Sequence, residues 1–252
     1  MFGNSEISYC GDLVRQYDKD RFLISLGFPA EQRTALWALF AFNHEIPKTR
    51  EVVSETTLGL IRLQWWRDAL KAIYEDGAVP EHEIVKALQG AIQACDLPRQ
   101  WFDDLTYARE FDLENMAPET LAGLENYADF THTPLMKLAV QITGGDPDHA
   151  AIKPVAQAYA MTGLLRAIPF HTGQGRSFVP ADMQNNPEHV RMIAEKGENL
   201  LQTAKADDKF TRICAQMTGL YLKQLKKRKY DVFDARLQVP PLFFPLRILW
   251  GF

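Results

Sequence analysis

The spacing of the apolar residues is the feature that most constrains how this chain can fold. Apolar residues recur three and four positions apart along most of the sequence, which places them on one face of an α-helix. In the segment 31–45, one such stripe contains Leu36, Leu39, Phe40 and Asn43. No window alternates apolar and polar residues for long enough to indicate a β-strand. The sequence therefore predicts an all-α protein.

Proline and glycine divide the periodic segments. Pro29 precedes the stripe described above, and the segments 77–80 (GAVP) and 144–149 (GGDPDH) interrupt the helical pattern. We expect helices near 31–45, 54–76, 81–95, 98–113, 118–143, 150–168, 187–204 and 207–230. The prolines at 240, 241 and 245 predict an irregular or short-helical structure for an apolar tail, 237–252. With no internal repeat or low-complexity linker, residues 1–252 are expected to form one helical domain of about eight helices.

Charge and cysteine content narrow the class of protein. The formal net charge of −4 gives no reason to expect nucleic-acid binding, and the basic run 225–229 is interpreted as a solvated helix end. The cysteines Cys10, Cys95 and Cys214 are far apart, which favours a reducing compartment over a zinc site. No apolar run approaches the length of a membrane span, and the N-terminal residues resemble neither a signal nor a transit peptide. We expect a cytoplasmic or matrix-like protein, peripheral to the inner membrane if the tail docks there.

Three segments, in the same order, match a known pattern. They are FPAEQRTALWALFAFNHE (28–45), IRLQWWRDAL (61–70) and AYAMTGLLRAIPFHTGQGRSFVP (158–180). Together they resemble the squalene/phytoene synthase family, and the resemblance covers nearly the whole chain. It implies a single helical bundle of the isoprenoid synthase type.

Active members of that family join two prenyl diphosphates, using Mg²⁺ that is held between two acidic motifs. Carboxylates four residues apart share a helix face, so both can reach one metal cluster. Where the resemblance places the first motif, this chain has Pro47, Lys48 and Glu51, and where it places the second, it has Ala167, Phe170 and His171. One carboxylate remains. The sequence therefore predicts no catalytic residue, no resident metal and no cofactor.

Each motif region also contains a proline within its predicted helix or just beyond it. Pro47 and Pro169 each remove a backbone donor and crowd the carbonyl four residues earlier. We expect each helix to kink or end at its proline.

Basic and aromatic side chains provide the candidate binding residues. Lys48, Arg50, Arg166 and Arg176 are interpreted either as holding an anionic head group without metal or as pairing with internal carboxylates. The candidates for lining a prenyl or quinone cavity are Phe42, Trp65, Trp66 and Tyr159, with plain core packing as the alternative. The apolar tail either docks on a membrane or partner, or packs against the domain itself.

One branch of the family resembles this chain most. The matching elements are Tyr9–Cys10, AFN-x-E (41–45), a VSE-containing run (53–66) and LRA-x-P-x-H (165–171). Members of that branch lack the acidic motifs and act in respiratory complex I assembly. The resemblance thus implies a non-catalytic protein that contacts a complex I subunit or assembly intermediate and holds an isoprenoid, quinone or lipid in its cavity. Two alternatives are an active Mg²⁺-dependent transferase that condenses two prenyl diphosphates, and a lipid or quinone carrier unrelated to assembly.

Overall fold

The computed structural model describes residues 7–52, 55–114, 117–173, 177–184, 186–241 and 244. All the regular structure within these residues is helical, which confirms the predicted fold class. The α-helices are α1 (Tyr9–Tyr17), α2 (Lys19–Ser25), α3 (Ala30–Val52), α4 (Thr56–Tyr74), α5 (Glu83–Cys95), α6 (Arg99–Leu113), α7 (Leu121–Ile142), α8 (Ile152–Gly173), α9 (His189–Thr203) and α10 (Lys209–Lys227). Two short 3₁₀ helices are η1 (Ala181–Met183) and η2 (Ala235–Gln238).

The structure has two more α-helices than the sequence pattern predicts, and both lie before α3. Each begins at a polar side chain that caps it. The Ser8 hydroxyl accepts a hydrogen bond from the Gly11 N–H (3.2 Å), and the Asp18 carboxylate accepts one from the Arg21 N–H (3.1 Å). These helices have nine and seven residues, too few for apolar periodicity to be recognised. In the sequence, these two helices are indicated by their N-cap residues and not by apolar periodicity.

Neither of the two prolines ends its helix. α3 continues beyond Pro47 to Val52, and α8 continues beyond Pro169 to Gly173. Of the two predicted alternatives, a kink or an end, the end at the proline is wrong for both helices, because packing along a long helix can outweigh the local cost of about 3 kcal/mol for an interior proline. Both motif regions therefore lie on the last turns of continuous helices.

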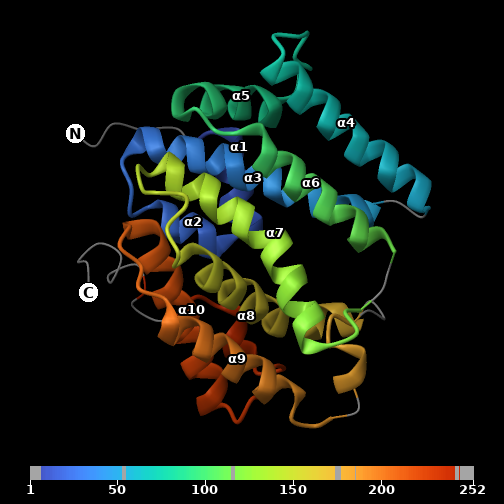
Figure 1. Ribbon diagram of the computed structural model, residues 1–252, viewed down its shortest axis with the longest axis vertical. Coiled ribbons are helices and arrows are strands. Elements are labelled where there is room, and N and C mark those ends of the chain that lie inside the picture. The colour runs from blue at the N-terminus through green and yellow to red at the C-terminus, as the bar shows by residue number, and fades with distance from the viewer. Residues whose placement is uncertain are drawn as a thin grey trace.

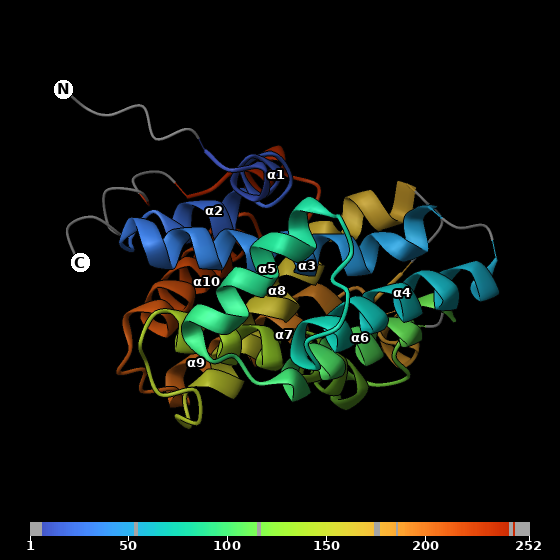
Figure 2. The same cartoon turned by 90° about the horizontal axis from the view of Figure 1, so that it is seen from above.

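Helix α3 runs through the middle of the bundle (Figures 1 and 2) and packs against α1, α4, α5, α6 and α7. Its residues from Ala35 to Asn43 are all buried, so it is surrounded on every side. α7 packs against α3, α8 packs along α7, α9 and α10 cover α8, and α4 packs on α6 at the opposite edge (Figure 1). This arrangement brings the C-terminal ends of α3 and α8 towards the N-terminal end of α7.

Among its described residues, the apolar tail contributes Leu237 and Phe244 to the hydrophobic core. Phe244 lies further along the tail. Its side chain is fully buried in the main hydrophobic cluster, and its N–H donates to the Pro241 carbonyl (3.1 Å). At this position the tail packs against the domain; residues 242–243 and 245–252 lie outside the described residues. Among the helices that the structure describes, none combines the length and apolar character needed to cross a bilayer.

Candidate functional site

The ends of α3 and α8 both lie beside Phe178, a residue of the segment 177–180 that follows α8. The Arg50 guanidinium carbon, near the end of α3, is 5.8 Å from the centre of the Phe178 ring. The His171 ring, near the end of α8, is 4.9 Å from it, and the Tyr127 ring of α7 is 5.5 Å away. Residues of both motif regions, Arg50 and His171, therefore contact the same aromatic side chain.

Charged groups near the end of α3 are paired within the protein. Lys48 Nζ lies 3.2 Å from Glu45 Oε1, and Arg62 Nη2 lies 2.9 Å from Glu45 Oε2. Glu51 belongs to α3, but its side chain is outside what the structure describes. Among the described side chains at this helix end, the Glu45 carboxylate thus pairs with two cations.

Mg²⁺ does not fit the described residues at these helix ends. It prefers several oxygen ligands, chiefly carboxylates and water. On α8 the corresponding positions hold the half-buried Ala167, the exposed Phe170 and the imidazole of His171. Within the described ranges, no group of three or more His, Cys, Asp or Glu side chains is arranged to hold a metal ion.

A buried network lies behind Tyr127. The Tyr127 hydroxyl donates to Asp112 Oδ1 (2.7 Å), and Arg109 Nη1 donates to Asp112 Oδ2 (3.1 Å). Burial raises the pKa of Tyr127 well above its usual value, and the Asp112 charge adds to that shift. Sequence reasoning missed this network. The Arg109–Asp112 spacing on a predicted helix suggests a pair, but the Tyr127 contact depends on how α6 and α7 pack.

The contacts of Arg166 agree with the interpretation that it pairs with an internal carboxylate. Its Nη1 lies 2.5 Å from Asp20 Oδ2, its Nε donates to the Leu237 carbonyl (2.8 Å), and its guanidinium lies 3.6 Å from the centre of the Tyr221 ring. The Tyr221 hydroxyl donates to the other Asp20 oxygen (2.7 Å). These contacts join α2, α8, α10 and η2. Arg176, the other candidate of this kind on the C-terminal side of α8, lies outside the described residues.

A polar cavity of about 190 Å³ lies beside this pair. Tyr159, one of the candidate lining residues, borders it. Two ion pairs border it as well: the Arg166–Asp20 pair and the Arg21–Asp18 pair, in which Arg21 Nη1 lies 2.5 Å from Asp18 Oδ2. A side chain at Gly163 would meet no atom within 4 Å, so this glycine leaves the cavity open. The charges that line the cavity thus compensate one another, two carboxylates against two arginines.

Three of the predicted cavity residues lie elsewhere. Phe42 retains none of its accessible surface and packs edge-on against Trp66 and Phe102, with ring centres 5.3 and 5.6 Å away. A side chain that lines a water-sized cavity keeps some accessible area, so Phe42 belongs to the core, and Trp66, 2% exposed, does too. Trp65 is 39% exposed on the outer face of α4, beside His82. The core interpretation replaces the cavity interpretation for Phe42 and Trp66.

His132 makes the stability of the fold sensitive to acid. Burial lowers the pKa of this histidine well below 6.5, and the charges of Arg21 and Arg109 lower it further. The unfolded chain therefore takes up a proton near pH 6.5 that the folded chain does not, so stability falls as the pH drops below that value.

We expect His132→Asn to remove this part of the acid sensitivity. Whatever the variant costs in free energy of unfolding at pH 8, the difference between variant and wild type should be smaller at pH 5, because only the wild-type histidine takes up a proton on unfolding below about pH 6.5. Urea unfolding at both pH values measures the two differences. A deficit that stays constant from pH 8 to pH 5 would contradict the assignment.

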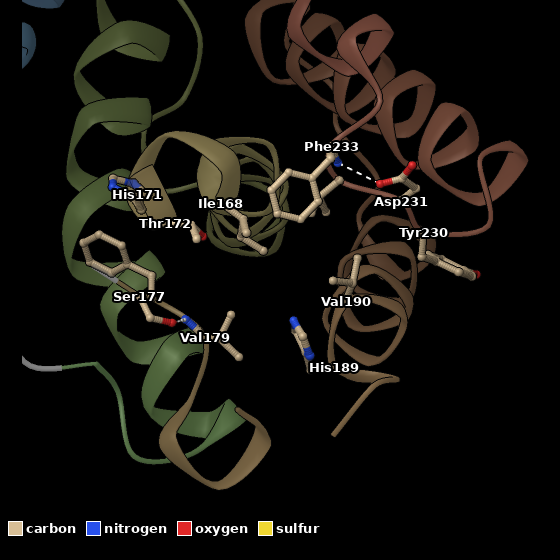
Figure 3. Close-up of a pocket in the computed structure, with 12 residues that line it drawn as sticks. Ile168, His171, Thr172, Ser177, Val179, His189, Val190, Tyr230, Asp231 and Phe233 are labelled. Carbon is tan, nitrogen blue, oxygen red and sulfur yellow. Dashed lines mark hydrogen bonds between the residues drawn. The ribbon is translucent and has the colours of Figure 1, made fainter. Parts of the chain in front are cut away.

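A cleft of about 360 Å³ lies beside the end of α8 (Figure 3). Its walls come from the last turns of α8, the segment 177–180, the start of α9 and residues 230–233 after α10. Phe178 borders this cleft as well as the space between the motif regions. The sequence pattern does not reveal it, because four separate segments form it.

Comparisons with known proteins identify a family and several relatives. The family model described as squalene/phytoene synthase matches residues 14–190. The human protein named NADH dehydrogenase (ubiquinone) complex I, assembly factor 6 is 30% identical over 264 residues, which cover 94% of this chain and 79% of the human chain. A presqualene diphosphate synthase of Sinorhizobium fredii is 25% identical over 192 residues, covering 75% of this chain and 65% of that one.

Two solved structures show the same fold. A dehydrosqualene synthase in complex with a ligand superposes with a TM-score of 0.79 at 19% identity, covering 96% of this chain and 93% of that one. A squalene synthase from Alicyclobacillus acidocaldarius superposes with a TM-score of 0.69 at 17% identity, covering 88% and 93% of the two chains. At these identities the likeness concerns the fold alone.

Proposed function

The chain belongs to the squalene/phytoene synthase family, and from this premise we propose that it is a non-catalytic member that acts in the assembly of respiratory complex I. The similarity to proteins named complex I assembly factor 6 extends over 94% of the chain for the human protein, and this observation carries the proposal. A complex I subunit or assembly intermediate is the corresponding partner. A cytoplasmic location, peripheral to the inner membrane, is part of the same proposal.

The chemistry of the motif regions supports the non-catalytic part. A departing diphosphate leaves with several negative charges, and metal ions normally carry that charge in the transition state. Here Arg50 and His171 lie beside the ring of Phe178, and Lys48 pairs with Glu45 on α3. A basic, partly aromatic site can attract an anion, but it offers no ligand set for Mg²⁺.

Deletion of the gene in its own host tests the assembly role. We expect NADH:ubiquinone oxidoreductase activity to fall while the isoprenoid content stays at the wild-type level, and a plasmid copy should restore the activity. Loss of an isoprenoid with normal complex I would instead favour the transferase. A deletion that leaves both unchanged would contradict the proposal and favour a carrier.

The purified protein is expected to release no diphosphate from farnesyl or geranylgeranyl diphosphate with Mg²⁺. We expect turnover below one-thousandth of the typical enzyme value of about 10 s⁻¹. The variant carrying Ala167→Asp and His171→Asp should be equally inactive, because Pro47 and Lys48 still stand on α3 where the family's first motif has carboxylates. A malachite green assay with added pyrophosphatase measures release. Diphosphate release by the wild type at a rate near that of typical enzymes would refute the non-catalytic assignment.

A further inference from the structure

We propose that the cleft beside the end of α8 binds a small neutral molecule that carries an apolar ring or chain and one hydroxyl group. The cleft volume of about 360 Å³ lies within the range of small-molecule sites, roughly 300–1,000 Å³. It lies on the α8 side of the motif regions: His171 and Phe178 border it, and no residue of 47–51 is among the described residues that line it.

The walls of the cleft are mainly apolar. Ile168, Val179 and Val190 contribute aliphatic surface, and Phe178 and Phe233 contribute rings. Phe233 is 65% exposed although it is a large apolar residue, and in Figure 3 its ring extends towards Ile168 across the cleft. A ligand with an apolar body would cover this ring and recover the cost of its exposure.

His189 provides a hydrogen-bond acceptor on the opposite wall. Its Nδ1 lies 2.6 Å from the Asn186 carbonyl oxygen. A carbonyl only accepts, so Nδ1 carries the hydrogen, and Nε2 of the neutral imidazole is left as an acceptor. In Figure 3 the ring lies between Val179 and Val190 at the edge of the cleft. A ligand hydroxyl can therefore donate to Nε2.

The charge of the lining favours a neutral ligand. Among the described lining residues, histidines apart, Asp231 is the one charged side chain, and its Oδ1 accepts from the Phe233 N–H (2.9 Å). A carboxylate in the wall repels an anion. The hydroxyls of Thr172 and Ser177 are uncharged. The site is thus unlike one that selects a diphosphate.

The backbone that forms the fourth wall is strained. Lys229 and Tyr230 are consecutive non-glycine residues with φ of 53° and 62°. Side chains seldom adopt this left-handed region, and such residues persist mostly where a functional site requires them. The Tyr230 N–H donates to the Leu225 carbonyl (2.9 Å), which holds the turn at the end of α10 and directs residues 230–233 towards α8. The strain is located where the cleft is built.

A pair of ligands that differ in one group tests the proposal. Para-pentylphenol and para-pentylbenzoate share a ring and a tail, but the first has a neutral hydroxyl and the second a carboxylate. We expect the full-length protein to bind the phenol at least about tenfold more tightly than the benzoate in isothermal titration calorimetry. Equal affinities, tighter binding of the benzoate, or no binding of the phenol would overturn the proposal.

Variants locate the binding site. Phe233→Ala should weaken phenol binding at least about fivefold with little change in Tm, since the side chain is 65% exposed. His189→Phe should weaken it similarly by removing the acceptor. Phe170→Ala is the matched control. Phe170 is another exposed phenylalanine (56%), and it lies at the end of α8 close to the cleft without lining it. Wild-type affinity in both Phe233→Ala and His189→Phe would refute the site.

The proposal does not depend on the assembly role. Binding of the phenol is measured on the isolated protein, whereas assembly is measured in cells. Failure of one therefore leaves the other standing.

Discussion

Replacing Arg166 with leucine is expected to lower the free energy of unfolding by about 3–5 kcal/mol, the usual cost of removing one partner of a buried ion pair. The Arg166 and Asp20 side chains are 19% and 13% exposed, so the carboxylate left behind is largely shielded from water. The variant also loses the hydrogen bond to the Leu237 carbonyl and the stacking on Tyr221. For a chain of this size the loss corresponds to a Tm lower by about 10 °C in calorimetry.

Arg191→Leu is the matched control for this variant. Arg191 also contacts two carboxylates, Glu188 (3.0 Å) and Glu195 (3.3 Å), but it is 51% exposed on α9. We expect this change to cost less than about 1 kcal/mol, because surface pairs contribute little. Adding Asp20→Asn to Arg166→Leu should restore part of the stability, since it removes the uncompensated carboxylate. Similar Tm values for Arg166→Leu and Arg191→Leu would contradict internal pairing and return Arg166 to the anion-binding candidates.

Phe42→Ala is expected to cost about 3–5 kcal/mol, the range for removing a large side chain from a packed core. The ring is completely buried and makes edge-on contacts with Trp66 on α4 and Phe102 on α6, each of which would lose a packing partner. Urea unfolding with an unchanged m-value would show that the fold is retained while its stability falls.

Phe170→Ala makes the same chemical change on the surface and should stay within about 0.5 kcal/mol of the wild type. A cost below about 1 kcal/mol for Phe42→Ala would contradict the core assignment. It would instead agree with the cavity interpretation of Phe42, in which the ring has fewer packing contacts to lose.

Particular residues show why the helices could be predicted from the sequence more easily than the contacts of the site. The stripe through Leu36 and Leu39 lies within a few turns of one helix, so its spacing is visible in the chain itself. The Asp20–Arg166 pair joins residues 146 positions apart, and no local pattern relates them. Lys48 and Arg166 were equal candidates for binding an anion, yet the structure gives each a carboxylate partner.

Phe178 illustrates the same limit at the motif regions. The resemblance to the family placed 47–51 and 167–171 opposite one another, and the structure brings Arg50 and His171 to the same ring. The sequence of the loop could not show that one aromatic side chain would contact both. That position depends on how the segment after α8 folds back towards α7.

The amino-acid sequence alone determined that the chain is helical and which residues stand at 47–51 and 167–171, because helical periodicity and residue identity are local properties. Only the tertiary structure decided which charges are neutralised, which aromatic residues are core and where a cleft remains open. Ion pairing, burial and cavities each depend on side chains from several helices meeting in space, and residues far apart in the chain supply them.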